Sequence, residues 1–323
     1  DRLDLTAGGR SSDNKQSSRQ AVIQLGAGSD ESGGSSEGVF TWSVSPRFEL
    51  SDRPSVYARV AKGYRPGGPN FIPAGAPADF PTAFKADTII SYEIGLRAET
   101  SDRRFSFDGS FFYLDWKNIL ILTTVTTPSG PVGVNGNGQK ARSKGFEFAV
   151  TARPTAGLTF ALNGAYTDAK LRNDTVPVEG GLNLVGGLAG DRLPYVPEYS
   201  ATASIDYEWA VGASATAYVG GNVSLVSDQP GTFSADYRAA YGRTPEIDGY
   251  QTVDLRAGIN FERIRLGVFV NNLFDSYGLS SLTPAPTFAP TDIGGNAGTY
   301  IVASGIRPRT FGADDRDAWR AVA

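Results

Sequence analysis

Tyrosine and arginine side chains occur together in two segments that could bind a small molecule. The first segment, residues 63–71, carries Tyr64 and Arg65. The second, residues 233–243, carries Tyr237, Arg238, Tyr241 and Arg243. Arginine supplies a permanent positive charge and a fork of donors, and tyrosine supplies a stacking ring and a hydroxyl. The pairing suits non-covalent binding of an anionic ligand, although both segments also fit ordinary strand exits and surface loops.

Residues that make and break bonds are scarce in this chain. It contains neither His nor Cys, which excludes a Ser-His-Asp triad, a zinc-thiolate site and a disulfide. The adjacent carboxylates at 30–31 and 314–315 lie in polar runs and are expected to be solvated. We therefore predict no enzyme activity, no catalytic residue, no metal site and no cofactor. The net charge of −4 gives no basic surface for nucleic acid.

The elements that must position these side chains show a two-residue alternation of apolar and polar residues. It recurs in residues 40–50, 90–99, 199–209 and 251–262. Successive side chains of a strand point to opposite faces, so each run has one apolar and one wet face. A strand of a soluble β-sandwich, the alternative, usually has about five or six residues. These runs reach about ten, the length that a membrane-spanning strand needs.

The connections between these runs alternate between short and long. The short ones are predicted at 51–54, 101–104, 154–157, 210–213 and 262–263, and the long ones at 11–38, 66–86, 127–136, 172–192, 228–247 and 283–298. Outer-membrane barrels have short periplasmic turns and long extracellular loops. The pattern predicts about twelve strands in six up-down hairpins, the first beginning near Leu3. The Gly- and Ser-rich segment 26–38 is predicted to be a mobile lid or a disordered loop.

Several segments together resemble the C-terminal barrel of the TonB-dependent receptors. In chain order they are Tyr57 to Gly67 (YARVAKGYRPG), Ser91 to Arg97 (SYEIGLR), Tyr113 to Ile119 (YLDWKNI), Asn137 to Glu147 (NGQKARSKGFE), Val270 to Asp275 (VNNLFD) and Arg307 to Gly312 (RPRTFG). Each segment is weak alone, but their order across nearly the whole chain is specific. Within VNNLFD, we expect Asn271, Asn272 and Asp275 to be structural, where a strand meets its loop.

The resemblance implies an all-β fold, an antiparallel up-and-down transmembrane β-barrel of which the chain supplies about 12 of about 22 strands. Residues 1–312 are predicted to be the C-terminal part of the barrel, and the plug domain is absent. Residues 313–323 are predicted to form an atypical tail, because clustered charges interrupt the alternation there. The chain lacks Met and begins at Asp1, so we expect a fragment whose targeting signal lies upstream.

The function implied by the resemblance is TonB-energised uptake of a scarce nutrient across the outer membrane of a Gram-negative bacterium. An iron-siderophore complex is the default ligand, and other metal chelates, cobalamin and glycans stay open. The implied partners are outer-membrane lipid, a small-molecule ligand such as a metal chelate, and the TonB complex, which would act through the missing N-terminal plug. A passive porin or structural barrel is the alternative function.

Two spatial predictions follow from the strand pattern. The apolar faces should form one outer belt, which includes Trp42, Ile94, Phe107, Phe148, Phe160, Ile205, Leu255 and Val268. The candidate ligand residues Tyr64, Arg65, Tyr237, Arg238, Tyr241 and Arg243 should lie at the extracellular mouth, at the end opposite to the short turns.

Overall fold

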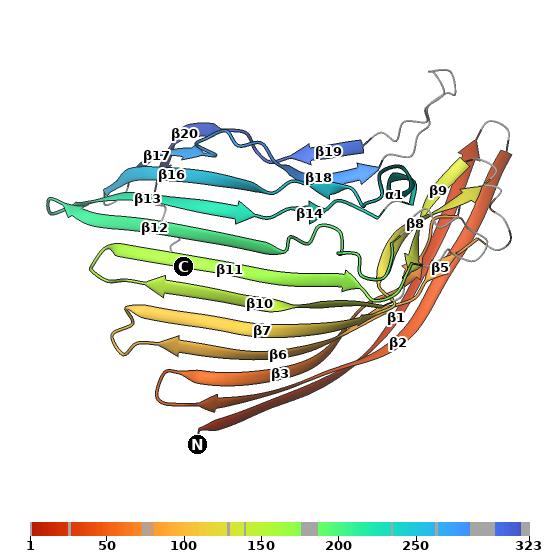
Figure 1. Cartoon of the computed structure of the whole chain (residues 1–323), viewed down its shortest axis with the longest axis horizontal. Helices are drawn as coiled ribbons and strands as arrows, with labels where there is room; N and C mark the ends of the chain where they lie inside the picture. The colour runs from red at the N-terminus through yellow and green to blue at the C-terminus, as the bar shows by residue number, and fades with distance from the viewer. Residues whose placement is uncertain are drawn as a thin grey trace.

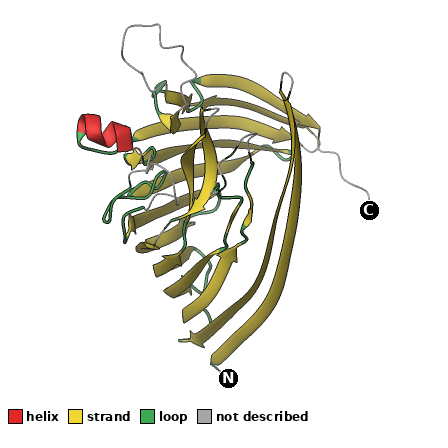
Figure 2. Ribbon diagram, turned by 90° about the vertical axis from the view of Figure 1, so that its right-hand side faces the viewer, coloured by secondary structure: helices red, strands yellow, loops and turns green. Residues whose placement is uncertain are grey.

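Twelve antiparallel strands form one continuous sheet in the computed structural model, which describes residues 2–24, 27–72, 76, 78, 80–127, 130–138, 140–175, 187–233, 235–261, 264–284 and 301–317. In their order across the sheet, the strands are β1 (Leu3–Gln24), β2 (Ala27–Glu49), β3 (Ser55–Arg65), β6 (Asp87–Glu99), β7 (Phe105–Lys117), β10 (Lys140–Ala152), β11 (Leu158–Leu171), β12 (Tyr199–Val211), β13 (Ala215–Val226), β16 (Tyr250–Phe261), β17 (Ile264–Asn271) and β20 (Thr310–Asp317). This confirms the prediction of about twelve strands beginning near Leu3. The sheet curves into a trough (Figures 1 and 2).

The trough is open along both edges. The strand order is linear from β1 to β20, so the described residues do not pair these two strands with each other. A sheet edge in lipid leaves backbone N–H and C=O groups without partners, which only closure of the barrel removes. The twelve strands are therefore one wall of a barrel.

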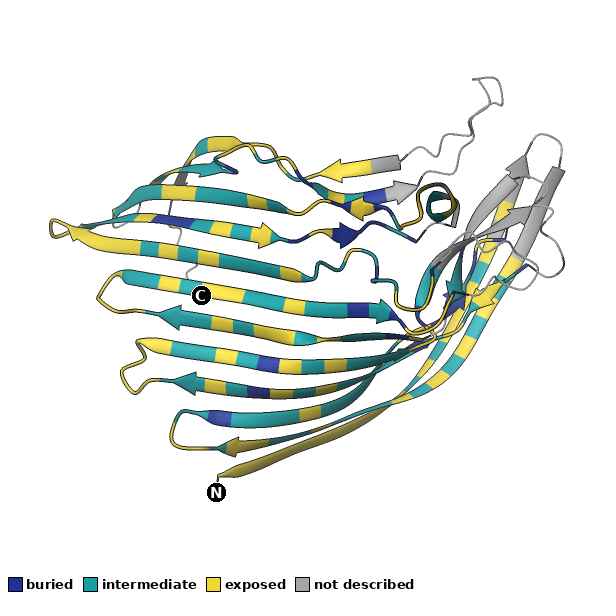
Figure 3. Ribbon diagram, viewed as in Figure 1, coloured by how far each residue is buried: buried dark blue, intermediate teal, exposed yellow. Residues whose placement is uncertain are grey.

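The two faces of the wall differ in chemistry, as the alternation predicted. Exposed and half-buried residues alternate along the strands (Figure 3). The strand register places the predicted belt residues on one face; for example, Phe160 pairs with Ile205, and Ile205 and Leu255 both pair with Gly221. Ile94 is 60% exposed and Val268 is 59% exposed, so neither side chain is packed under a second sheet. The belt on one face is confirmed, and the sandwich alternative is wrong.

Short turns and long connections lie at opposite ends of the sheet (Figure 1). The long connections carry additional elements: the strand pairs β4 (Gly68–Pro69) with β5 (Ala83–Phe84), β8 (Leu120–Thr127) with β9 (Gly130–Asn137), β14 (Gln229–Pro230) with β15 (Glu246–Ile247) and β18 (Leu279–Pro284) with β19 (Ile301–Gly305), and helix α1 (Ala235–Tyr241). The predicted long connection at 127–136 lies between β7 and β10 as expected, but most of it belongs to the β8–β9 hairpin rather than to an irregular loop. Most of the predicted loops 172–192 and 283–298, and the predicted turn at 262–263, lie outside the described residues.

The first predicted long loop is also wrong. Residues 11–38 continue β1 and β2 as a two-stranded hairpin, paired without interruption from Leu3↔Phe48 to Gln24↔Ala27. The predicted lid at 26–38 is thus strand β2 from Ala27 onward. The physical reason is that β-strand pairing uses hydrogen bonds between backbone groups, whatever the side chains are. A hairpin that extends beyond the membrane has water on both faces, so its sequence needs no alternation of apolar and polar residues.

The last strand also extends further than expected. β20 continues to Asp317 and pairs with β17 through Asp317↔Ile264, so the first five residues of the predicted tail extend the sheet. Residues 318–323 lie outside the described part.

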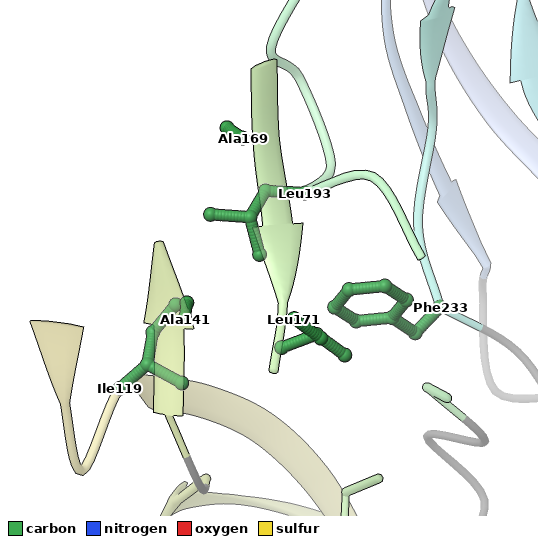
Figure 4. Packing of buried hydrophobic residues seen from close by; sticks show 6 residues of the cluster. All are labelled: Ile119, Ala141, Ala169, Leu171, Leu193 and Phe233. Atoms are coloured by element: carbon green, nitrogen blue, oxygen red, sulfur yellow. The ribbon is translucent and has the colours of Figure 1, made fainter. Parts of the chain in front are cut away.

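The largest cluster of buried apolar side chains lies at the long-connection end. Ile119, Ala141, Ala169, Leu171, Leu193 and Phe233 pack together there (Figure 4). Ala141 and Leu171 pair with each other at the ends of β10 and β11, whereas Leu193 and Phe233 come from the connections that follow β11 and β13. The connections are therefore anchored to the sheet end by a small core of their own.

Candidate functional site

The candidate ligand residues all lie at the end of the sheet that carries the long connections. Arg65 is the last residue of β3, and α1 with Arg243 lies in the connection between β13 and β16 (Figure 1). This agrees with their predicted place at the mouth. A side chain already bound within the protein has less to offer a ligand, so the contacts of each residue decide its availability.

Arg65 forms an ion pair with the buried carboxylate of Asp87. Its Nε donates to Asp87 Oδ2 at 3.1 Å, a second guanidinium nitrogen makes a closer contact with the same oxygen, and the Leu120 N–H donates to it at 3.3 Å. Asp87 is 4% exposed. The guanidinium also lies over the Trp116 ring, 5.6 Å from its centroid. The Arg65 side chain nevertheless stays 49% exposed, so part of it is open to solvent.

Tyr64 stands on the other face of the sheet. It pairs with Thr88, whereas Arg65 pairs with Asp87, and neighbouring residues of a strand point to opposite faces. Tyr64 therefore shares the outward face with Tyr92 of β6, and that face carries the apolar belt. The alternation that predicted the strand also contained this signal, but the two residues were grouped by their type alone.

Two of the four candidate residues in and just after helix α1 are exposed. Tyr241 is 67% exposed and its ring lies 4.5 Å from that of Tyr237, measured between centroids. The side chain of Arg243 is 61% exposed and donates to Glu246 Oε2 at 2.8 Å. Gly242 ends the helix with φ of +72°, a backbone conformation that a larger residue would adopt only with strain. Its N–H donates to Arg238 O at 2.7 Å, as is common at the end of a helix.

Arg238 is bound within the protein. Its guanidinium forms an ion pair with Asp191, and the same carboxylate accepts the Leu188 N–H at 2.7 Å. Arg238 thus ties α1 to the connection between β11 and β12. Arg192 makes a parallel link, because it donates to Asp228 Oδ2 and to the Asp228 carbonyl, both at 2.9 Å.

Three other connections are tied together by residues that the sequence did not single out. Asn70 is 3% exposed; its amide nitrogen donates to Pro81 O at 3.0 Å and to Asn135 O at 2.9 Å, and its Oδ1 accepts the Asn135 N–H at 2.9 Å. The carboxylate of Glu37 accepts the N–H groups of Gly67 at 2.9 Å and Ala86 at 2.6 Å. The β1–β2 hairpin, the 66–86 connection and the β8–β9 hairpin therefore form one linked unit.

Asn137 adds a further link and was noted only as part of a motif. Its amide nitrogen donates to Lys85 O at 2.8 Å and Asn118 O at 3.1 Å, and its Oδ1 accepts the Lys85 N–H at 2.7 Å. An asparagine followed by glycine at a strand end is the signal that could have identified it. Asn70 offers no such signal, because its partners are distant in sequence.

The inner face of the wall is lined by paired polar groups. Tyr57 donates to Glu93 at 2.5 Å and Arg97 donates to Asp108 at 3.0 Å. Further along the sheet, Arg256 donates to Asp206 at 2.5 Å, Asn222 donates to Asp254 at 2.9 Å, and Arg265 lies over the Tyr218 ring at 4.8 Å. Because these opposite charges are paired, the inner face is hydrophilic but does not strongly attract ions of either sign.

Asn272 and Asp275 of the VNNLFD segment have structural roles, as expected. Asn272 has φ of +51° and is 4% exposed. Its amide nitrogen donates to Ser276 O at 2.9 Å and Arg307 O at 3.2 Å, and its Oδ1 accepts the Ser276 N–H at 2.8 Å. The Asp275 carboxylate accepts the Arg309 N–H at 2.8 Å. These two side chains close the corner where β17 ends.

Among the described residues, no group of His, Cys, Asp and Glu side chains is arranged to hold a metal ion. Among the same residues, no helix has the length and apolarity to cross a membrane. What the described mouth presents is exposed Tyr and Arg side chains, on connections that buried amides and ion pairs anchor.

Comparison with known proteins identifies the family. Residues 1–273 match the family model described as TonB dependent receptor-like, beta-barrel. The chain belongs to this family of TonB-dependent receptor barrels. It lies in the bacterial outer membrane, where the apolar belt faces lipid and the paired polar groups face the lumen.

Individual relatives agree with this assignment. The chain is 31% identical over 281 residues to the pesticin receptor of Yersinia enterocolitica, which covers 85% of this chain and 37% of that receptor. The solved structure of the ferric yersiniabactin uptake receptor of Yersinia pestis matches 98% of this chain and 43% of that one, with a TM-score of 0.76 and 26% identity. The ferric-catecholate import receptor of E. coli K12 shares the fold, with a TM-score of 0.67 and 19% identity over 97% of this chain and 42% of that one. The chain thus spans less than half the length of these relatives.

Proposed function

We propose that this chain is the C-terminal part of a receptor barrel that takes up an iron-siderophore complex across the outer membrane. Residues 1–312, together with the end of β20 to Asp317, contribute the barrel wall, and the remaining strands and the plug belong to a preceding part of the receptor. Energy from the TonB complex would reach the bound ligand through that plug. The protein would act by binding and passage, without catalysis.

The match to the ferric yersiniabactin uptake receptor carries this proposal, because it extends over 98% of the chain. The architecture of the mouth supports it. The connections are linked to one another and anchored to the sheet end, an arrangement suited to holding a ligand. A passive pore needs no such linked cover.

Within the mouth, we propose Tyr241 and Arg243 as the principal ligand contacts of this chain, with the exposed part of the Arg65 side chain as a third. Ferric siderophore complexes are commonly anionic and often aromatic, so stacking and positive charge both favour them. Arg238 holds α1 in place through its ion pair with Asp191, and the Tyr237 ring lies against that of Tyr241. Tyr64 is left out of the proposed contact set, because it stands on the outward face.

Uptake is tested in iron-starved cells that carry the complete receptor as their sole route for one ferric siderophore. The expected result is accumulation of radioactive iron that stops when TonB is removed. Accumulation that is unchanged without TonB would show a passive pore instead.

Ligand contact is tested separately by titrating the purified complete receptor with ferric siderophore and following tyrosine and tryptophan fluorescence. The double variant Tyr241→Ala/Arg243→Gln should bind about tenfold more weakly or worse, the loss expected for one stacking and one charged contact. Arg153→Gln, at the short-turn end, is the matched control and should bind as the wild type does. Equal affinity of all three proteins would remove α1 from the proposed site.

A further inference from the structure

The outward face of β7, β10 and β11 carries a group of basic residues at its long-connection end. These residues, called the basic cluster below, are Lys117, Lys140, Arg142, Lys144, Lys170 and Arg172. The register places them on the belt side: Lys144 pairs with Tyr113, and the next outward row pairs Phe146 with both Phe111 and Tyr166. The basic cluster therefore faces away from the lumen and away from the proposed ligand mouth.

Like charges stand directly opposite one another in the basic cluster. Lys117 pairs with Lys140, and Arg142 pairs with Lys170. Directly opposed like charges destabilise a sheet. Carboxylates face two members of the cluster, because Arg142 also pairs with Asp115 and Lys144 pairs with Asp168. Lys117 and Lys140 face no carboxylate in this register, so their mutual repulsion calls for a negative partner.

The protein supplies only part of that negative charge. Lys170 donates to Asp168 at 2.7 Å, and Lys144 lies 3.8 Å from the same carboxylate. Arg172 lies 3.6 Å from Asp115. Lys117 and Lys140 make no ion pair with any residue that the structure describes. Six basic residues thus share two carboxylates, and the Lys144 side chain stays 51% exposed.

Aromatic rings lie directly below the basic cluster on the same face. The Phe146 ring is 6.0 Å from Phe111 and 5.9 Å from Tyr166, between centroids, and Tyr92 and Tyr113 are 6.3 Å apart. Aromatic rings of this kind mark the level where a membrane barrel passes from lipid to water. The basic cluster therefore stands at the height of the lipid headgroups.

An apolar depression continues the surface toward the middle of the membrane. It has a volume of about 580 Å³ and is lined in part by Val56, Ile94, Phe107, Phe111 and Phe148. Gly109 lies between Phe107 and Phe111 on the outward row of β7, and the Phe107 ring packs over it. From Lys144 to Phe148 the strand advances roughly 14 Å, about the distance from a headgroup to the upper part of an acyl chain.

We propose that the basic cluster and the apolar depression together bind one phosphate-bearing lipid of the outer leaflet. Its phosphates would lie among Lys117, Lys140 and Arg142 and relieve the opposed charges, and an acyl chain would lie in the depression. A bare anion would satisfy the basic cluster alone, and a neutral lipid would satisfy the depression alone. The vertical alignment of both features on three paired strands favours a single amphiphilic molecule.

The test uses the complete receptor, purified from outer membranes, and native mass spectrometry with added lipid. The probes are a diphosphorylated disaccharide lipid with several acyl chains, the same lipid without its phosphates, and inorganic phosphate. The variant is Lys117→Gln/Lys140→Gln. The matched control, Arg104→Gln/Arg153→Gln, removes the same charge at the short-turn end, where both residues are exposed.

The wild type should retain the diphosphorylated lipid, and the variant should bind it about 30-fold more weakly, since each basic residue near a charged lipid contributes about 1 kcal/mol. The control pair should leave the affinity unchanged, and the charge-keeping variant Lys117→Arg/Lys140→Arg should bind as the wild type does. A thermal unfolding curve for each variant shows whether the barrel is intact.

Three results would overturn the proposal. Equal weakening by the control pair would show that only net charge matters. Equal binding of the lipid without phosphates would leave the basic cluster no role. Binding of inorganic phosphate as tight as that of the lipid would identify an anion site that holds no lipid.

Discussion

Asn70 and Asn135 hold each other by reciprocal hydrogen bonds, although 65 residues separate them in sequence. The side-chain amide of Asn70 satisfies both the N–H and the C=O of Asn135 in β9, so it replaces one step of a strand ladder. This single buried side chain links the connection after β3 to the β8–β9 hairpin.

Replacing Asn70 with Ala should release that link. The Asn135 N–H and the carbonyls of Asn135 and Pro81 would lose their partner, and each buried group left unsatisfied costs about 1–3 kcal/mol. We expect hydrogen exchange at the Asn135 amide to become at least tenfold faster while exchange within β10 is unchanged. Asn163→Ala, which removes an exposed amide from β11, is the control. Unchanged exchange at Asn135 in the Asn70 variant would mean that the hairpin is held by other contacts.

The Arg65–Asp87 pair should respond unequally to loss of its two members. Arg65→Gln leaves the nearly buried Asp87 carboxylate without its cation and should cost about 2 kcal/mol of unfolding free energy. Asp87→Asn should cost about half as much, because a neutral amide oxygen can still accept the Leu120 N–H. The double variant should lose less than the sum, which denaturant unfolding of the complete barrel measures. Additive losses would show that the pair contributes no coupling.

Asn272 should separate the contribution of backbone conformation from that of hydrogen bonding. Asn272→Ala removes three side-chain hydrogen bonds and also places Ala at φ +51°. Asn272→Gly removes the same bonds but tolerates the backbone, so it should be less destabilised than Ala by about 1 kcal/mol. Thermal unfolding of both variants is the measurement. If Gly is as destabilised as Ala, the hydrogen bonds account for the whole loss.

The short turn after β6 should make a small contribution that depends on pH. The Thr100 hydroxyl and the Arg104 N–H donate to Asp102 and hold the pKa of this carboxyl below its usual range. A lowered pKa in the folded state adds stability above the pKa of the unfolded chain, and this stability is lost as the pH falls through the folded pKa. The turn should therefore weaken only in acid, below about pH 4.

A titration of the Asp102 carboxyl by NMR in the folded barrel tests this. Thr100→Val removes the largest cause and should move the Asp102 pKa back toward its ordinary value. A Thr100 variant with an unchanged titration would assign the shift to the Arg104 N–H instead.

The membrane wall was predictable from the sequence because lipid imposes a strict rule on each strand. Alternation placed Ile94, Phe160 and Leu255 on one face, and all three lie there. The rule ends where the strands leave the lipid. Residues 11–38 lack alternation, yet they extend the β1–β2 hairpin, because water accepts polar side chains on both faces.

The candidate site was predictable only in part for a related reason. Residue type identified Tyr241 and Arg243, which are exposed on a connection at the mouth. It could not show that Arg238 is engaged by Asp191, since ion pairs between connections depend on how those connections fold together. Nor could it identify Asn70, whose partners lie in a different hairpin.

The height of the β1–β2 hairpin has a consequence for what can approach the receptor. β1 contains 22 residues, and about 9–11 residues suffice to cross the membrane, so roughly half of the hairpin stands above the surface. Its attachment through Glu37 keeps it upright beside the 66–86 connection. Objects much larger than a chelate, such as antibodies or the tail of a bacteriophage, would touch this arm before they reach the opening, while small solutes pass beside it unhindered.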